Sequence, residues 1–200
     1  VAQLESQGTH FVRWGAPDEA HPGVSIGCDN YQGGQSITEH LIALGKRSFA
    51  FIGDNGEHAP EFKARYNGYF ETLIAHGLDK NSVQENANST EDAGSEAIKS
   101  LLQNKALPQA IVCASDLIAM GVLRALRQAK VNVPDDVAVV GYDNIAVSAY
   151  TTPSLTTVQQ NTKLAGELLV NTLLKAINNE EVEDYLMPAD IIIRQSCGSD

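Results

Sequence analysis

The sequence predicts an α/β fold built from doubly wound parallel sheets, and three observations support this prediction. Short apolar runs of strand length alternate along the chain with longer stretches that have helical spacing. Two of the runs, residues 111–114 and 137–140, are apolar at every position, as expected of strands that helices cover on both faces. Polar residues follow each of these two runs, which places them at one edge of a parallel sheet.

The clearest unit of this alternation spans residues 111–158. Its first strand ends at Ser115 and Asp116, which are favourable residues for starting a helix. Apolar residues then recur at spacings of three and four, at Ile118, Val122, Leu123, Leu126 and Ala129. The Val-Pro-Asp-Asp run at 133–136 ends the helix, and the second strand leads to Asp143. Because open α/β sheets bind ligands beyond the carboxyl ends of their strands, Asp116 and Asp143 are candidate ligand-binding residues.

The remaining elements follow the same alternation. Strands are predicted over residues 9–12, 24–26, 48–52 and 191–193. Helices are predicted over residues 31–44, 62–76, 89–103 and 162–178, from apolar residues at helical spacing and from glycines that follow two of them.

Composition excludes several classes of function. The net charge of −11 argues against direct binding of a phosphate backbone, and no apolar run approaches the length of a membrane span. Three cysteines, an odd number without CxxC spacing, indicate reduced thiols in the cytoplasm rather than a disulfide framework. The five histidines lack the spacing of metal ligands, so no metal and no cofactor is predicted.

The chain has no recognisable catalytic motif. It contains no GxSxG elbow, no GxxxxGK[ST] loop and no GxGxxG following a strand. Gly33 and Gly34 lie near the start of a predicted helix, where an anion can bind, but the adjacent Lys-Ser or Lys-Thr pair of a phosphate-binding loop does not follow them. We therefore predict that the protein is not an enzyme.

Several motifs occur in a fixed order along nearly the whole chain. They are Asp29-Asn30 with Gly33-Gly34, residues 40–45, Arg65-Tyr66-Asn67-Gly68-Tyr69, Ser115-Asp116 with Ala119-Met120-Gly121, residues 133–144, residues 153–160 and Arg194-Gln195-Ser196. In these motifs the chain resembles the periplasmic-binding-protein-like, effector-binding core of LacI/GalR-type transcription regulators. Each motif alone is weakly specific, and their order makes the resemblance specific.

The resemblance implies two α/β subdomains with a ligand cleft between them. It assigns residues 1–28 and 161–188 to an N-terminal subdomain, and residues 29–160 and 189–197 to a C-terminal, effector-binding subdomain. Family members carry a DNA-binding helix-turn-helix and several βα units before the strand predicted near Phe11, and this chain lacks them. We therefore expect an N-terminally truncated core with an incomplete N-terminal subdomain.

Four residues are the first candidates for effector binding. Asp143 offers a carboxylate that accepts hydrogen bonds from two adjacent hydroxyls, although a turn residue is the alternative. Arg65 matches an arginine that the family places at the cleft and offers five donors in a fixed fork. Asp29 matches a family position on the hinge side of the cleft. Asp116 either contacts ligand or caps its helix.

Four further candidates follow from the resemblance alone. Arg13 stands where the family often places an effector-contacting acid, and this departure leaves the identity of the ligand open. Trp14 suits stacking on a sugar ring or packing in a core. Glu61 and Ser89 align with ligand-facing positions.

The resemblance leads to one functional hypothesis with two alternatives. The chain is expected to be the ligand-sensing core of a repressor that binds a sugar or glycoside and couples it to operator affinity. Operator DNA would be bound only through a domain missing from this chain, and a homodimer would form near residues 120–124 and 150–153. A periplasmic sugar-binding protein and a purine-sensing regulator are the alternatives, because fold alone does not separate them.

Overall fold

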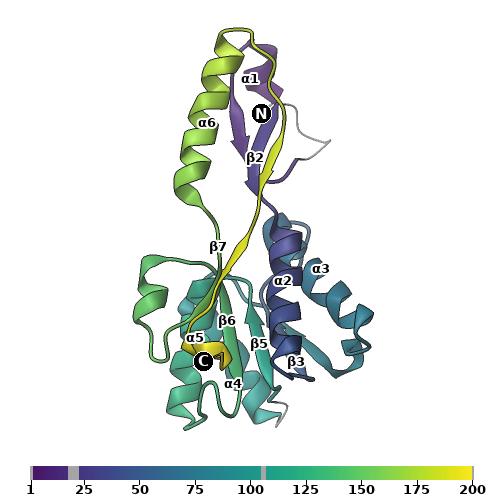
Figure 1. The fold of residues 1–200 in the computed structure, drawn as a ribbon, viewed down its shortest axis with the longest axis vertical. Coiled ribbons are helices and arrows are strands. Elements are labelled where there is room, and N and C mark those ends of the chain that lie inside the picture. Colours follow the sequence, from purple (N-terminus) through teal and green to yellow (C-terminus); the bar gives the residue numbers. More distant parts are fainter. Residues whose placement is uncertain (1, 18–22, 105–106, 200) are drawn as a thin grey trace. The chain divides into compact units, whose positions relative to one another are not determined.

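The computed structural model describes residues 2–17, 23–104 and 107–199, and the chain forms two compact units (Figure 1). The smaller unit comprises Val1–Asp29 and Gln160–Ala189, and the larger comprises Asn30–Gln159 and Asp190–Asp200. Within the described residues, no helix is both long enough and apolar enough to cross a bilayer.

The larger unit is built on a six-stranded sheet with the order β4-β3-β5-β6-β7-β9. Its strands are β3 (Phe49–Ile52), β4 (Ser82–Glu85), β5 (Ala110–Cys113), β6 (Ala138–Asp143), β7 (Thr156–Gln159) and β9 (Asp190–Ile192). All neighbours pair in parallel except β9, which runs antiparallel to β7. Every residue of β3 and β5 is buried, which explains why these strands read as continuous apolar runs.

Two pairs of helices cover the faces of this sheet. They are α2 (Asn30–Ala43) with α3 (Pro60–Ala75), and α4 (Glu91–Gln103) with α5 (Asp116–Gln128). The chain leaves β3 outward to β4 and then returns past β3 to β5, so right-handed crossovers place α3 and α4 on opposite faces (Figure 1). The predicted doubly wound α/β class is confirmed, and the strand order reverses beside β3 and β5, where such sheets bind ligands.

Two glycines, Gly34 and Gly68, let α2 and α3 cross at close range. A Cβ added at Gly34 would lie 2.1 Å from the backbone oxygen of Arg65, and one added at Gly68 would lie 2.0 Å from that of Tyr31. Real atoms do not approach this closely, so both positions require glycine. Gly34 is therefore explained by helix packing, and this crossing also positions Arg65.

The smaller unit carries a three-stranded parallel sheet with the order β1-β2-β8. Its elements are α1 (Ala2–Ser6), β1 (Val12–Trp14), β2 (Val24–Cys28), α6 (Thr162–Ile177) and β8 (Tyr185–Met187). A small core joins Cys28, Ala165 and Met187, with Leu164 and Leu168 packed against it. Many apolar side chains of this unit are exposed, including Trp14, Val170, Leu174, Ile177, Tyr185 and Leu186.

Several element predictions were wrong at their boundaries or incomplete. The first strand begins at Val12 rather than at residue 9, and the helix predicted from residue 89 begins at Glu91, because the Thr90 side chain accepts a hydrogen bond from the Ala93 amide. Strands β4, β7 and β8 were not predicted, since β4 and β7 contain polar residues and β8 is only three residues long. The structure also contains 3₁₀ turns, η1 (Asp79–Asn81), η2 (Ala146–Tyr150) and η3 (Gln195–Cys197).

Candidate ligand-binding site

Arg65 is a buried arginine that three elements hold in place. It lies in the second turn of α3 and is only 4% exposed. Its Nε donates to the Oδ1 of Asn30 over 2.8 Å, and a terminal nitrogen donates to the carbonyl oxygen of Ala114, just after β5. Because helix α2, helix α3 and the end of β5 all contribute, the orientation of the guanidinium is set by the fold.

Asp143 lies beside this guanidinium at the end of β6. The distance between Arg65 Nη1 and Asp143 Oδ1 is 3.4 Å, and the guanidinium carbon lies 3.7 Å from the centre of the Tyr142 ring. A cation over an aromatic face and next to a carboxylate is stabilised by both. The Asp143 side chain is 29% exposed, so a ligand can reach a carboxylate whose neighbour is a fixed fork of donors.

Asp116, for which ligand contact and helix capping were the two alternatives, is a buried residue. Its side chain is 0% exposed, its Oδ1 accepts a hydrogen bond from Thr157 over 2.6 Å, and its Oδ2 accepts one from the Ile145 amide over 2.9 Å. The predicted direct contact between Asp116 and a ligand is therefore not supported, because the carboxylate is covered. Helix capping is carried by Ser115 instead, whose hydroxyl accepts a hydrogen bond from the Ile118 amide.

Burial also changes the acidity of Asp116. Removal from water raises the pKa of this carboxyl to about 6, and the nearby charge of Asp143 acts in the same direction. The hydrogen bonds from Thr157 and Ile145 and the charge of Arg194 oppose the rise without cancelling it. Asp116 therefore titrates within two pH units of neutrality.

Glu61 and Ser89 belong to the same unit as Arg65. Glu61 lies in the first turn of α3 and is half-buried. Ser89 precedes α4, and its hydroxyl lies 2.8 Å from that of Ser115. Ser89 is thereby connected to the end of β5, one residue away from the carbonyl that binds Arg65. Their contact with a ligand stays a prediction.

The other three candidates lie in the smaller unit. Arg13 and Trp14 are on β1, where Arg13 is half-buried and Trp14 is 45% exposed, so Trp14 is not a core residue of the described structure. Asp29 follows β2, and its backbone amide donates to the Met187 carbonyl. These three side chains also stay predicted ligand contacts.

Three contributors to this site were absent from the candidates. Asn30 and Tyr142 contact Arg65 directly. The sequence showed both as parts of motifs of the resemblance, next to Asp29 and Asp143, but not as partners of Arg65. Arg194 donates to Asn144 Oδ1, Ser148 Oγ and the Leu155 carbonyl, which fastens the segment that follows Asp143. The sequence shows Arg194 only as the close of a motif, because its partners lie about 40–50 residues earlier in the chain.

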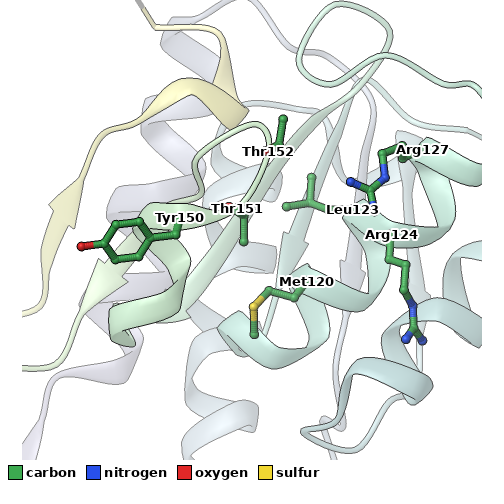
Figure 2. A pocket seen from close by; sticks show the side chains of 7 residues that line it. All are labelled: Met120, Leu123, Arg124, Arg127, Tyr150, Thr151 and Thr152. Carbon is green, nitrogen blue, oxygen red and sulfur yellow. The ribbon is translucent and has the colours of Figure 1, made fainter.

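A separate hollow of about 250 Å³ lies on the outer side of α5 (Figure 2). Residues from α5 and from the end of η2 line it, namely Met120, Leu123, Arg124, Arg127, Tyr150, Thr151 and Thr152. Tyr150 is 84% exposed at its rim. Within the described ranges, no cluster of three or more His, Cys, Asp or Glu side chains is suited to hold a metal ion.

Comparison with known proteins shows the family to which the chain belongs. Residues 38–197 match the model of the periplasmic binding protein-like domain. The repressor PurR of Glaesserella parasuis is 33% identical over 193 residues, which is 92% of this chain and 56% of the relative. The chain belongs to the LacI/GalR family. This is a non-enzymatic family, which confirms the prediction that the domain is not an enzyme.

Solved structures of LacI/GalR members agree with this assignment. A complex of the regulator CelR with cellobiose has a TM-score of 0.86 and 31% identity, covering 96% of this chain and 60% of that one. A dimeric Lac repressor has a TM-score of 0.87 and 25% identity, covering 98% and 72%. The chain spans little more than half the length of the curated relatives it matches.

Proposed function

We propose that this chain is the part of a LacI/GalR transcriptional repressor that senses a sugar or glycoside. The observation that carries the proposal is the pairing of Arg65 with Asp143. Asp143 ends β6, and Arg65 reaches from α3 to the carbonyl that follows the neighbouring strand β5. Arg65 offers donors and Asp143 offers acceptors within one small area, which is the arrangement that adjacent hydroxyls of a sugar require. CelR, with 31% identity, was solved with cellobiose, which supports this ligand class.

We further propose that ligand binding is coupled to DNA binding. Ligand binding would favour one of two arrangements of the core and so change the affinity of a DNA-binding domain outside this chain for its operator. We place this regulator in the cytoplasm, where its three buried cysteines would be reduced thiols. The division into an N-terminal and a C-terminal subdomain belongs to the same proposal.

A ligand screen tests the proposed sensor. Purified protein is heated with ribose, glucose, cellobiose, hypoxanthine or guanine, and its unfolding temperature is recorded. A ligand at 100 times its dissociation constant stabilises the protein by about 2.7 kcal/mol, which raises the midpoint by several degrees. Asp143→Ala is expected to lower the affinity for the stabilising sugar by roughly 10- to 100-fold, because it removes a charged hydrogen-bonding partner.

Asp136 provides a matched control for this screen. It is an exposed carboxylate of the same unit whose side chain accepts hydrogen bonds from Asn132, so Asp136→Ala is expected to leave the affinity unchanged. Stabilisation by a purine alone would replace the sugar with a nucleobase as the effector. A sugar that binds Asp143→Ala as well as the unchanged protein would show that the site lies elsewhere.

The hollow beside α5 is proposed as the surface through which two copies associate. It carries an apolar floor of Met120 and Leu123, with Tyr150 projecting from its rim (Figure 2). Two arginines, Arg124 and Arg127, also line the hollow, and tyrosine and arginine are residue types enriched at the centre of protein interfaces. A two-fold dimer uses the same patch on both copies, so the ring of one copy would meet the hollow of the other. The Lac repressor that matches this chain was solved as a dimer.

Sedimentation of a Tyr150 variant tests this surface. Tyr150→Ala is expected to weaken the dimer by about 30-fold or more, since central aromatic residues contribute about 2 kcal/mol or more to association. Ile74→Ala is the control, because Ile74 is an apolar residue of α3 that is 52% exposed and does not line the hollow. An unchanged dimer in Tyr150→Ala, or a dimer weakened equally by Ile74→Ala, would exclude the proposed surface.

A further inference from the structure

The segment between the candidate ligand site and the proposed dimer surface is short. The chain passes from Asp143 through Asn144 and Ile145 directly into η2, which ends at Tyr150. Both Asp143 and Asn144 have positive backbone φ angles, of 111° and 53°, which residues other than glycine adopt uncommonly. Surrounding contacts must therefore hold this backbone in place.

Asp116 contacts this backbone directly. One carboxylate oxygen accepts a hydrogen bond from the Ile145 amide, and the other accepts one from the Thr157 hydroxyl. The same hydroxyl oxygen accepts a hydrogen bond from the Asn144 amide over 3.3 Å. Two successive amides of the segment thus depend on Asp116, one directly and one through Thr157.

The space around the carboxylate is closed. A Cβ added at Gly141 would lie 2.3 Å from Asp116 Oδ1, so the side chain has no alternative position on that side. From the far side, Arg194 binds Asn144, Ser148 and the Leu155 carbonyl. Residues 144–150 are therefore held by hydrogen bonds to the buried carboxylate of Asp116 and to Arg194.

We propose that Asp116 is a positioning residue that sets the backbone of residues 144–150 and thereby links Asp143 to Tyr150. The roles of the two ends rest on the proposed function, whereas the positioning itself does not. The ionised carboxylate accepts from both donors. A protonated carboxyl gives up part of that accepting capacity, so the segment is expected to loosen when Asp116 takes up a proton.

The charges around Asp116 place this change at mildly acidic pH. Asp143 at the end of β6 and Arg194 before η3 face it with opposite charges, and the buried thiol of Cys113 on β5 is also close. Burial raises the pKa of Asp116 to about 6. Because this value lies above the ordinary one, the stability that the group contributes is present at low pH and is lost as the pH rises through 6. Burial favours the protonated form, whereas the hydrogen bonds from Thr157 and Ile145 favour the ionised form. Acidification therefore stabilises the whole fold through this buried group while it weakens the two hydrogen bonds that hold residues 144–150.

Hydrogen exchange of the purified protein measures this loosening. Protection factors, corrected for the intrinsic pH dependence of exchange, are compared for residues 144–150 at pH 7.5 and pH 5.0, with α2 as an internal reference. In the unchanged protein, protection of residues 144–150 is expected to fall about fivefold or more at pH 5.0, while that of α2 does not fall with it. Asp116→Ala is expected to show low protection at both pH values.

Asp116→Asn separates positioning from simple support of the fold. Its amide has one acceptor oxygen and one donor, as the protonated carboxyl has, and it does not titrate. The segment is therefore expected to show, at both pH values, the protection that the unchanged protein shows at pH 5.0. Thr157→Val, which removes the acceptor for the Asn144 amide, gives a second measurement if Asp116→Ala does not fold. Asp136→Ala is the control and is expected to behave as the unchanged protein.

Three results would overturn the proposal. They are pH-independent protection in the unchanged protein, the same pH dependence in Asp116→Asn, and full protection in both Asp116→Ala and Thr157→Val. Sedimentation of the same samples distinguishes this failure from that of the proposed function. If residues 144–150 loosen in Asp116→Ala while the unchanged protein is monomeric, then Asp116 positions the segment and the proposed dimer surface is wrong.

Discussion

Replacing Arg65 with methionine is expected to lower the free energy of unfolding of the larger unit by about 3 kcal/mol, as is typical when one partner of a buried ion pair is removed. Methionine fills similar space but leaves Asp143, the Oδ1 of Asn30 and the Ala114 carbonyl without their shared donor. Small proteins have about 5–15 kcal/mol of stability, so the loss is a large fraction of the total. Urea denaturation followed by circular dichroism measures it.

Two companion variants identify the cause of this loss. Arg65→Lys keeps the charge but not the planar fork, so it is expected to recover only part of the stability. Arg65→Met combined with Asp143→Asn removes both charges and is expected to be less unstable than the sum of the two single changes. A loss below about 1 kcal/mol for Arg65→Met would show that solvent, rather than the protein, satisfies Asp143.

The second large effect is expected from Gly34→Ala. The added methyl group would meet the backbone oxygen of Arg65 at 2.1 Å, and backbone atoms cannot turn aside as a flexible side chain does. Helices α2 and α3 must therefore separate, and overpacking of this kind costs about 1–3 kcal/mol. Because α3 carries Arg65, the change is also expected to weaken the sugar binding proposed above.

Gly166→Ala is the matched control for this experiment. Gly166 lies inside α6, and nothing approaches within 4 Å of the position where its Cβ would stand. There the same substitution is expected to stabilise the helix by about 0.5–1 kcal/mol, since alanine is the better helix former. If Gly34→Ala unfolds at the same urea concentration as the unchanged protein, the close crossing of α2 and α3 does not limit stability.

The sequence alone predicted those parts of the fold that depend on local pattern. The unit from residue 111 to 158 has buried strands, an amphipathic helix and a Pro-containing break, and each of these leaves a signal within a few residues. The edge strand β4, with an exposed Val83, leaves no such signal, because its place depends on pairing with β3. The direction of β9 also depends on a partner, β7, that lies more than thirty residues away.

For the candidate site, too, the sequence predicted some features, and others required the tertiary structure. Asp143 and Arg65 were recognisable as candidates from residue type, motif and position at the ends of predicted elements. Their pairing, and the support from Asn30 and Tyr142, required the packing of α2, α3 and β6. Asp116 shows most clearly what local sequence does not predict. An aspartate that follows a strand has the same neighbours in the chain whether its side chain is buried or exposed to solvent.

By itself, the sequence therefore determined the alternation of strands and helices, the family resemblance and the residue types available for a ligand. Only the tertiary structure decided which of these residues meet. Hydrophobic periodicity and capping act over a few residues, whereas burial and hydrogen bonding join residues that lie far apart in the chain. Arg65 and Ala114, separated by 49 positions, are joined in this way, and so are Asp116 and Thr157, separated by 41.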